Sequence, residues 1–306
     1  DLSGGNPLFP AHELRPGYLR ADPRDRAAVE RSIADAGGLV GTFDKPRFVH
    51  FEESLCAHSR SSITGCTRCL DLCPTGAITP NGNSVAIDAN VCAGCGSCAS
   101  VCPTGAASYA LPSADALMRR LRTLLQTYRK AGGSDAAVLF HDGEHGEDII
   151  DALARFGAGL PANVLPLRVN EVTQLGPDTI AAVFAYGGSG VALLTRARPR
   201  HDIAALRRAA ELSDRVVSAL GFGAGLVRII ETDDPDQLRA LLDTAPRGVA
   251  TQKPASFVPR GAKRGVLETT FRELHLAAPA PADVVPLPAG APFGGVKLDV
   301  EGCTLC

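Results

Sequence analysis

The sequence predicts a multidomain protein that combines an α+β part with an α/β part, and two observations carry this prediction. Eight of the ten cysteines of the 306-residue chain lie within residues 56–102, which indicates a small α+β domain organised by its cysteines. Between residues 135 and 245, short β-branched runs alternate with helical patterns. That alternation is typical of a parallel sheet covered by helices, here a sheet of about four strands.

Changes in composition divide the chain into six segments. Hydrophobic residues make up 45% of the chain and charged residues 21%, which is ordinary for a globular protein large enough for two or three domains. The predicted segments are an N-terminal extension with one helix (1–45), the cysteine-rich domain (46–112), a connecting helix (113–133), an α/β docking domain (134–248), a proline-rich linker (249–293) and the truncated start of a further cysteine motif (294–306).

The cysteine spacing points to iron–sulfur clusters. Gaps of two residues let three successive cysteines curl around one four-iron cube, while a fourth, just before proline, ligates the other cube. The motif reads Cys66-x2-Cys69-x3-Cys73-Pro74, with Cys56 upstream, and then Cys92-x2-Cys95-x2-Cys98-x3-Cys102-Pro103. Two such runs predict two [4Fe-4S] clusters with crossed ligation. The first would take Cys56, Cys66, Cys69 and Cys102, and the second Cys92, Cys95, Cys98 and Cys73.

Residues 46–110 resemble a bacterial two-cluster ferredoxin domain, and the eight cysteines are the ligands that this resemblance carries over. The segments at 73–77 and 102–106 both read Cys-Pro-Thr-Gly-Ala, which matches the internal two-fold repeat of that family. The resemblance implies a ferredoxin-like 2[4Fe-4S] fold and one-electron transfer.

Cys56 departs from the family pattern. The first gap of the family is short, whereas nine residues separate Cys56 from Cys66 here. The strand-like run at 47–51 still supports Cys56, because such a strand normally leads into the first ligand of the family. The inserted loop carries His58 and Arg60. Beside the first cluster, their hydrogen bonds and positive charge would raise its reduction potential.

Disulfides and zinc are the other interpretations of this cysteine spacing. Disulfides do not suit a chain with the features of a cytosolic protein. Zinc sites use two pairs of cysteines with a longer separation, not three at two-residue spacing followed by Cys-Pro. The cluster signature of radical SAM enzymes places its three-residue gap first, which is the reverse of the order found here. Iron–sulfur ligation therefore fits best.

Charge and hydropathy exclude several classes of function. The net charge is −2 and the pI is about 6.4, so the chain lacks the basic footprint of a nucleic-acid-binding protein. The most apolar stretch, 180–194, is interrupted by glycines and is too short to span a bilayer. The sequence shows no signal peptide, and it begins at Asp1, so the natural N-terminus is expected to lie further upstream. Labile clusters and unpaired thiolates predict a reducing, cytoplasmic location.

Two helices are expected outside the main domains. Asp22-Pro23 has the pattern of an N-cap followed by the first helical residue, and helical spacing continues to Gly37-Gly38. We expect this helix to pack on the cysteine-rich domain. Ser113 can cap a second helix over 114–130, which has one apolar face and five basic residues elsewhere. Those charges indicate a solvated face, with a basic docking surface as the alternative.

The α/β domain should place three polar loops at one edge of its sheet. The expected strands are 136–140, 164–168, 191–195 and 226–230, and the expected helices are 146–156, 177–187, 202–220 and 235–243. Ligands of such sheets bind at the carboxyl ends of the strands. The loops that follow three of the strands are 141–145, a loop that includes Asn170 and Glu171, and 196–201.

Each loop has a functional interpretation and a structural one. His141 and His145, with Asp142 or Glu144, could bind a metal or shuttle protons, but acidic residues at a helix N-terminus also explain this loop. The arginines at 196, 198 and 200 could hold a phosphate or the carboxylates of a partner, or they are surface charge. No dinucleotide fingerprint or phosphate-binding P-loop follows any of these strands.

The α/β domain is weakly similar to the small iron–sulfur (delta) subunit of methanogen-type hydrogenases. The similarity rests on the strand order, on the segment Val-Asn-Glu-Val at 169–172 and on the glycine-rich segment 187–194. It implies a domain that docks beside an electron relay. That family carries cysteines in its strand-end loops, whereas this chain has none between residues 103 and 302. The resemblance therefore carries over no ligands.

The C-terminal region ends within a second cysteine motif. Residues 266–277 are expected to form a short helix or strand, and the prolines of 279–292 to form a stiff linker. A short alternating strand then precedes Cys303-x2-Cys306, the plan that precedes Cys92 and Cys95. Because two cysteines cannot complete a four-iron site, we expect an incomplete third site and a further ferredoxin-like domain in the parent protein. A free cysteine pair is the alternative.

These features together predict an electron-transfer protein with two [4Fe-4S] clusters. Residues 44–110 carry four basic and five acidic side chains, a near-neutral balance that favours a module fixed to a redox partner over a mobile carrier. The expected partner is a dehydrogenase, hydrogenase or reductase subunit. Two alternatives are an enzyme whose α/β domain binds a flavin, nucleotide or metal, and a module whose clusters only hold the fold. No nucleophile with its base is evident.

Overall fold

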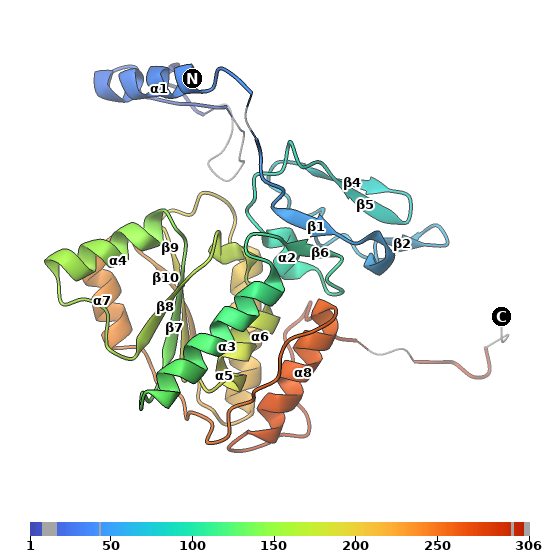
Figure 1. The fold of residues 1–306 in the computed structure, drawn as a ribbon. Coiled ribbons are helices and arrows are strands. Elements are labelled where there is room, and N and C mark those ends of the chain that lie inside the picture. The colour runs from blue at the N-terminus through green and yellow to red at the C-terminus, as the bar shows by residue number, and fades with distance from the viewer. Residues whose placement is uncertain (8–16, 43, 295–296, 303–306) are drawn as a thin grey trace.

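The computed structural model describes residues 1–7, 17–42, 44–294 and 297–302. Its largest part is an α/β layer structure, and the cysteine-rich segment sits above this structure in Figure 1. The N-terminal helix stands apart at the top of the same view, and residues 297–302 extend away from the body. Within the described ranges, no helix is both long and apolar enough to cross a membrane.

The central sheet has four parallel strands, as the sequence predicts. The strands are β7 (Ala137–His141), β8 (Val164–Arg168), β9 (Gly190–Thr195) and β10 (Val227–Glu231). Their spatial order is β10-β9-β7-β8. The chain therefore moves outward from β7 to β8 and then crosses back to β9. This reversal creates a topological switch point between the carboxyl ends of β7 and β9, which is where open α/β sheets form a crevice.

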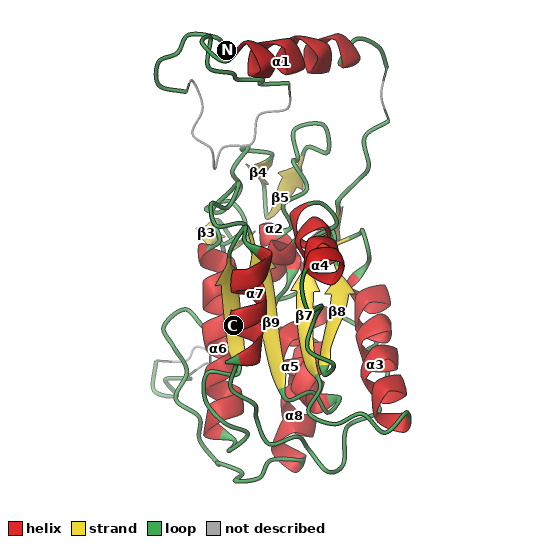
Figure 2. Ribbon diagram, turned by 90° about the vertical axis from the view of Figure 1, so that its left-hand side faces the viewer, coloured by secondary structure: helices red, strands yellow, loops and turns green. Residues whose placement is uncertain are grey.

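Helices cover both faces of the sheet, as Figure 2 shows. One face carries α4 (His145–Phe156) and α7 (Pro235–Asp243), and the other carries α3 (Ala114–Lys130), α5 (Pro177–Ala185) and α6 (Ala204–Ala219). Neighbouring residues of β7 point to opposite faces, because side chains alternate along a strand. Phe140 joins the core under α3, α5 and α6, whereas Leu139 joins the core under α4 and α7.

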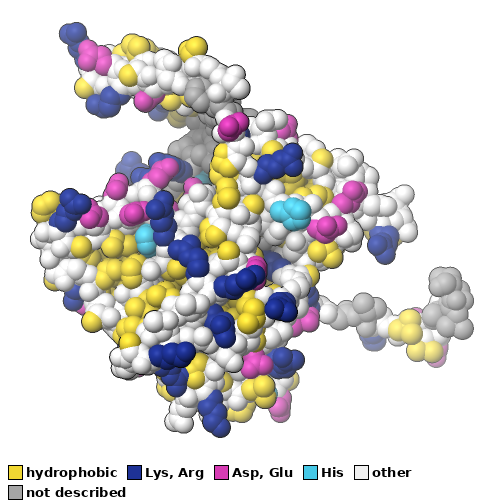
Figure 3. Space-filling view, in the orientation of Figure 1, with side chains coloured by type: hydrophobic (Ala, Val, Ile, Leu, Met, Phe, Trp, Pro, Cys, Tyr) yellow, Lys and Arg dark blue, Asp and Glu magenta, His cyan; other side chains and the backbone are white. Residues whose placement is uncertain are grey.

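Helix α3 belongs to the α/β layers, although the sequence suggested a connecting spacer. Its predicted bounds are confirmed, and the hydroxyl of Ser113 accepts a hydrogen bond of 3.3 Å from the backbone N–H of Ala116. Its apolar face, which includes Leu121, is buried in the core of the sheet. Cationic side chains gather over its outer side in Figure 3. Two of them, Arg122 and Arg129, donate to backbone carbonyls of Ser256 and Gln252, which supports the interpretation as an ordinary helix surface.

A further helix, α8 (Lys263–Leu276), lies in the segment that the sequence analysis assigned to a proline-rich linker. It packs against α5, all of whose residues are buried. Leu267, Thr270 and Leu274 recur at helical spacing and form the buried side of α8. The short helix or strand expected at 266–277 is therefore a helix, and it begins at Lys263. The linker expected over 249–293 is interrupted by this helix.

Helix α1 (Arg26–Gly38) differs from its prediction in start and in packing. It begins at Arg26, because the Asp25 side chain accepts a hydrogen bond of 3.0 Å from the Ala28 N–H and takes the N-cap role expected of Asp22. None of its residues, all of which the structure describes, is buried. Figure 1 shows it away from the cysteine-rich segment. The expected packing on that segment is therefore wrong, since the apolar positions of α1 are too few to form a broad stripe.

The cysteine-rich segment is built from very short elements. Its strands are β1 (Val49–Phe51), β2 (Ser59–Arg60), β3 (Ile63–Thr64), β4 (Ile78–Asn81), β5 (Ser84–Ile87) and β6 (Ala107–Tyr109), and its helical turns are η1 (Glu53–Leu55) and α2 (Ser97–Val101). β1 pairs with β6, which joins the two ends of the segment. Its buried apolar cluster contains only Ile78, Val85 and Cys98 among the described residues. Such a small core leaves the segment dependent on other restraints.

Buried hydrogen bonds fix the cysteine-rich segment to the carboxyl edge of the sheet. The hydroxyl of Thr173, in the turn η2 (Val172–Gln174), donates to the Cys95 carbonyl at 2.5 Å. Ser100 donates to the Leu175 carbonyl at 2.8 Å. Lys263, at the start of α8, donates to the Ala99 carbonyl at 2.6 Å. These contacts come from two separate parts of the α/β layers, the turn η2 with its end at Leu175 and the start of α8. The segment is therefore held in a fixed position on the sheet.

Candidate metal centre and adjoining cavity

The eight clustered cysteines are all free thiols in one small volume of the segment. Cys95 and Cys98 are buried, and the other six are partly exposed. Cys98 lies in α2, and Cys102 ends that helix. The remaining cysteines follow short strands or turns, so backbone geometry alone does not bring them together. Their mutual electrostatic influence indicates which of them converge.

One group consists of Cys69 and three neighbours. Burial and the nearby thiols of Cys102, Cys66 and Cys56 together raise the pKa of Cys69 to about 11. A nearby charge affects a pKa only over a short distance, so these three thiols are neighbours of Cys69. Cys102 joins them from the second half of the motif. They are the four residues that the spacing assigns to the first cluster.

The second group surrounds Cys98. Burial raises the pKa of the Cys98 thiol, and the thiols of Cys95, Cys92 and Cys73 raise it further, in that order. The pKa of Cys95 is also raised, chiefly by burial, with contributions from Cys73 and Cys92. Cys73 thus lies near the second group although it belongs to the first half of the motif, and Cys69 also acts on Cys98. The crossed ligation stays a prediction from the spacing.

Both groups favour a bound cationic centre. Burial and neighbouring thiols raise the pKa values of Cys69, Cys95 and Cys98, so these thiolates are costly to form without a cationic partner. Iron removes that cost by taking the thiolates as ligands. Among the described residues, no three Cys, His, Asp or Glu side chains could hold a single metal ion. A cubane differs from such a site, because it spreads its protein ligands over several irons.

A small hairpin explains how Cys56 and Cys66 can belong to one group despite their separation. The inserted residues form the antiparallel strands β2 and β3, joined by Ser61 and Ser62, whose φ angles are 51° and 63°. Positive φ at both central residues is typical of a tight two-residue hairpin turn. The hairpin projects outward and returns the chain close to its start, where the Gly65 N–H donates to the His58 carbonyl at 2.7 Å.

His58 and Arg60, which both lie in this insertion, have different environments. His58 is buried, and its Nδ1 lies 2.9 Å from the Cys66 carbonyl oxygen. Arg60, on β2, is exposed. His58 therefore supports the backbone of a candidate ligand, as expected of a residue beside the first cluster.

The internal repeat is visible in the contacts of the two Cys-Pro-Thr segments. The Thr75 hydroxyl lies 3.7 Å from the sulfur of Cys73, and the Thr104 hydroxyl lies 3.6 Å from the sulfur of Cys102. The Ala107 N–H also donates to the Cys102 sulfur at 3.4 Å. Hydrogen bonds to cluster sulfurs are one means by which a protein sets a reduction potential.

Lys263 adds a positive charge from a distant part of the chain. Burial raises the pKa of Cys102, but hydrogen bonds from Ala107 and Thr104 and the charge of Lys263 outweigh it and lower that pKa. The ammonium group also lies 3.6 Å from a carboxylate oxygen of Asp178. Sequence reasoning missed Lys263, because nothing in its local pattern places it beside a cysteine located far away in the sequence.

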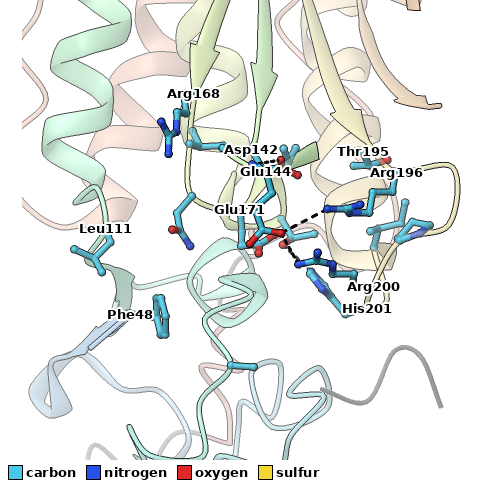
Figure 4. Close-up of a pocket in the computed structure, with 18 of the residues that line it drawn as sticks. Phe48, Leu111, Asp142, Glu144, Arg168, Glu171, Thr195, Arg196, Arg200 and His201 are labelled. Atoms are coloured by element: carbon cyan, nitrogen blue, oxygen red, sulfur yellow. Dashed lines mark hydrogen bonds and ion pairs between the residues drawn. The ribbon is translucent and has the colours of Figure 1, made fainter. Parts of the chain in front are cut away.

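A cavity of about 1010 Å³ separates the cysteine-rich segment from the carboxyl edge of the sheet. The three loops predicted from the strand ends all line it: 142–144, 168–173 and 194–203. The facing wall comes from the cysteine-rich segment and the start of α3, and includes Phe48 and Leu111 (Figure 4). The sequence located the loops, but it did not indicate that the cysteine-rich segment closes the site from the other side.

The histidine loop does not form the metal site considered from the sequence. His141 is buried, with Nδ1 at 2.9 Å from the Asp142 carbonyl oxygen. His145 Nε2 lies 2.9 Å from a carboxylate oxygen of Asp233. Asp142 instead accepts hydrogen bonds from the N–H groups of Glu144 and Gly146 at the start of α4. The polar-loop interpretation is therefore correct, because the acidic side chain satisfies backbone donors of the helix.

The arginine loop and Glu171 form the charged part of the cavity. Glu144 pairs with Arg200 at 2.7 Å and with Arg196 at 3.5 Å. Burial, reinforced by the nearby charge of Asp142 and only partly offset by Arg200, raises the pKa of Glu171 to about 7. The carboxyl group of Glu171 is therefore poised to change charge near neutral pH.

The comparison with protein families identifies the cysteine-rich segment. Residues 64–106 match the family described as a 4Fe-4S dicluster domain. These residues are a ferredoxin-type iron–sulfur segment. The match begins after Cys56, so it does not bear on that ligand. No curated protein and no solved structure matched the chain, and the resemblance to the hydrogenase delta subunit gains no support from them. Cys303 and Cys306 lie outside the described residues.

Proposed function

We propose that the chain relays single electrons through two [4Fe-4S] clusters as a subunit or partner of a larger oxidoreductase. The first cluster is held by Cys56, Cys66, Cys69 and Cys102, and the second by Cys92, Cys95, Cys98 and Cys73. Each cluster passes one electron at a time, and the protein sets the potentials through burial and hydrogen bonds. Electrons leave the chain by way of a redox protein partner.

One observation supports this proposal most strongly. Cys73 lies near the thiols of the second half of the motif, and Cys102 lies near those of the first half. Neither a zinc site nor a set of disulfides would require this crossed placement of the two cysteines. The crossed arrangement suits two cubes placed side by side, since one cysteine from each half of the motif then reaches over to the other cube. The influence of Cys69 on Cys98 further indicates that the two groups are neighbours.

The role as part of a complex is supported by the way the segment is attached. Its hydrogen bonds to Leu175, Thr173 and Lys263 hold the proposed second cluster against the α/β layers. A carrier that diffuses between partners needs no such support. The α/β layers then serve to dock the relay on a dehydrogenase, hydrogenase or reductase subunit. A reducing, cytoplasmic location belongs to the same proposal, because the clusters need protection from oxidation.

Iron and sulfide analysis with an anaerobic redox titration tests the clusters. We expect about eight irons and eight sulfides per chain and a reversible one-electron change at each of two centres. Four irons per chain would leave a single cluster and overturn the relay. Clusters that cannot be reduced reversibly would favour a purely structural role. Anaerobic purification of the tagged protein from its natural host, followed by mass spectrometry, tests the partner. A stoichiometric oxidoreductase subunit is the expected outcome.

A further inference from the structure

The cavity between the cysteine-rich segment and the sheet lies where an open α/β sheet binds ligands. It extends across the carboxyl ends of β7 and β9, the strands that flank the topological switch point. Its volume of about 1010 Å³ is at the upper end of the range for small-molecule sites. The cavity is therefore large enough for a nucleotide-sized ligand.

One wall of the cavity is apolar and belongs to the iron–sulfur side. Phe48, Ala93, Leu111 and Pro112 line it. The Phe48 ring lies flat on the backbone at Gly94, where an added Cβ atom would come within 2.8 Å of the ring. Gly94 lies between Cys92 and Cys95. A planar group stacked on this wall would thus be separated from the proposed second cluster by about one side chain.

The opposite wall is polar and includes buried groups without partners. Thr195 and His201 both line the cavity, and each is 8% exposed. The Thr195 hydroxyl and His201 Nδ1 are themselves buried without a hydrogen-bond partner among the described residues. Unpartnered buried polar atoms are costly, so a turn of the Thr195 hydroxyl toward a bound ligand would be favourable. Arg196 and Arg200 stand beside them in Figure 4, next to the N-terminal end of α6.

The charge of the lining favours an anion. Five cationic side chains line the cavity against three carboxyl groups. Arg120 has no ion pair or hydrogen bond within the described part of the chain. Glu171 is also held partly neutral by its raised pKa. Guanidinium groups are typical phosphate ligands, because they form charge-assisted hydrogen bonds with its oxygens.

We infer that this cavity binds a phosphate-bearing flavin of the mononucleotide class, with its ring system on the wall formed by Phe48 and Leu111 and its phosphate at Arg196 and Arg200. A flavin suits the position better than a nicotinamide, because it exchanges electrons singly as well as in pairs, whereas a nicotinamide transfers hydride. The choice of a flavin over a nicotinamide rests on the proposed two-cluster relay. The phosphate subsite at Arg196 and Arg200 does not, because no iron ligand takes part in it. The inference deepens the proposed function by naming the ligand that the relay would serve.

Titration of flavin mononucleotide with the anaerobically purified, iron-loaded chain tests the inference, with quenching of flavin fluorescence as the readout. Riboflavin, which lacks the phosphate, is titrated in parallel. We expect saturable quenching by the chain, with riboflavin bound at least about tenfold more weakly, since each charge-assisted hydrogen bond to phosphate contributes that much or more. Equal affinities for the two flavins, or no saturable quenching by either, would overturn the inference.

Three variants sharpen the phosphate assignment. The double variant Arg196→Gln and Arg200→Gln should lose the preference for the phosphorylated flavin. Glu144→Gln should increase that preference, because it removes the carboxylate that now pairs with both arginines. The matched control is Arg155→Gln, an exposed residue paired with Asp151 on α4 and absent from the cavity lining. It should retain wild-type affinity. A loss of preference in the control as well would indicate general electrostatics rather than a site.

Phe48→Leu separates the ring subsite from the phosphate subsite. This variant should weaken the binding of flavin mononucleotide and of riboflavin by the same factor, so the ratio of the two affinities should not change. A change in that ratio would contradict the proposed orientation. Iron content is measured on the same samples. A chain with full iron content that binds no flavin overturns this inference and leaves the relay intact. A chain that binds flavin but incorporates no iron overturns the relay and leaves the phosphate subsite intact.

Discussion

The two halves of the molecule are held together by different forces. The α/β layers bury large side chains such as Phe140, Phe184 and Tyr186 in a continuous core. The cysteine-rich segment has strands of two to four residues and a buried cluster of Ile78, Val85 and Cys98. Apolar burial stabilises the first half without assistance. The second half is too small for that, and we propose that iron supplies the missing restraints.

Because the stabilising forces differ, each half leaves a different pattern in the sequence. A fold stabilised by a metal centre shows itself in the spacing of a few ligands, because the ligands must converge on fixed points. A fold stabilised by apolar packing shows itself in periodicity spread over many residues. Five experiments can test this contrast, and the one that should change the molecule most is the removal of iron.

Iron removal should unfold one half and spare the other. After chelation under anaerobic conditions, we expect the amides of β4 and β5 to lose most of their protection from hydrogen exchange, because their core is too small to persist alone. The amides of β7 and β9 should keep theirs. The measurement is hydrogen exchange with mass spectrometry before and after chelation. Retained protection in β4 and β5 would show that the segment does not need metal.

Cys56→Ala should halve the iron content. With one ligand lost, the first cluster should fail to assemble while the second keeps its four thiolates, so iron falls from about eight to about four per chain. Iron analysis and the spectrum of the remaining cluster provide the measurement. Ser54→Ala is the control, since its hydroxyl contacts only Glu52 on the surface. Unchanged iron in the Cys56 variant would remove this residue from the ligand set.

Phe140→Ala should destabilise the α/β layers by about 3–5 kcal/mol, because it removes a fully buried ring and leaves a cavity. Its matched control is Phe156→Ala, since that ring is 88% exposed and its loss should cost less than about 0.5 kcal/mol. Urea unfolding followed by circular dichroism gives both values. Iron content should be normal in both variants. Loss of iron in the Phe140 variant would mean that the two halves fold as one unit.

Glu171→Gln should change how stability depends on pH. The pKa of Glu171 rises from 4.5 to about 7 on folding, so the folded protein retains a proton that the unfolded chain has released. Stability therefore falls as the pH rises from about 4.5 to about 7 and is constant above that. The glutamine in the variant has no carboxyl group to ionise, so the stability of the variant does not fall in this way. The Glu171→Gln variant should be more stable than the wild type at pH 8 by about 2 kcal/mol.

Urea unfolding at several pH values from 5 to 8 measures this effect, and the difference between variant and wild type should disappear at the acidic end. Glu268→Gln, an exposed residue on α8 paired with Arg264, is the control and should behave as the wild type at every pH. A difference between Glu171→Gln and wild type that does not vary with pH would show that the carboxyl group does not titrate in this range.

Lys263→Met should lower the potential of the proposed first cluster by about 60 mV or less, the one-electron equivalent of a tenfold change in equilibrium. The reason is the loss of a positive charge that acts on Cys102. Redox titration followed by electron paramagnetic resonance resolves the two centres. Lys253→Met, an exposed residue in the segment between α7 and α8, is the control. An equal shift of both clusters would indicate a structural change instead of a local charge effect.

Much of the fold could be predicted from local signals. β8 and α7 begin and end where the sequence indicates, because a short apolar run and an Asp-Pro cap are sufficient to define them. In α1 two Asp residues compete for the N-cap, and the start of the helix was predicted too early. In α8 the sequence left a helix and a strand open. Helix α8 exists because α5 has a second apolar side to cover, which is a tertiary requirement.

The candidate site divides in the same way. The spacing predicts a crossed grouping of the eight cysteines, because the length of each gap limits which cube a ligand can reach. The hairpin that returns Cys66 to Cys56 and the charge of Lys263 beside Cys102 were not predictable. Both depend on contacts between residues whose local sequence gives no sign of a partner.

The iron–sulfur character of the cysteine-rich segment and the parallel sheet can be predicted from the sequence, because ligand spacing and side-chain periodicity are local properties of the chain. The way in which the two parts face each other is visible only in the tertiary structure. The cavity exists because Phe48 and Leu111 come to lie opposite Arg196 and Arg200. That juxtaposition depends on interdomain hydrogen bonds such as the one from Thr173 to Cys95. Such bonds form between groups far apart in the sequence, and no periodicity or spacing records them.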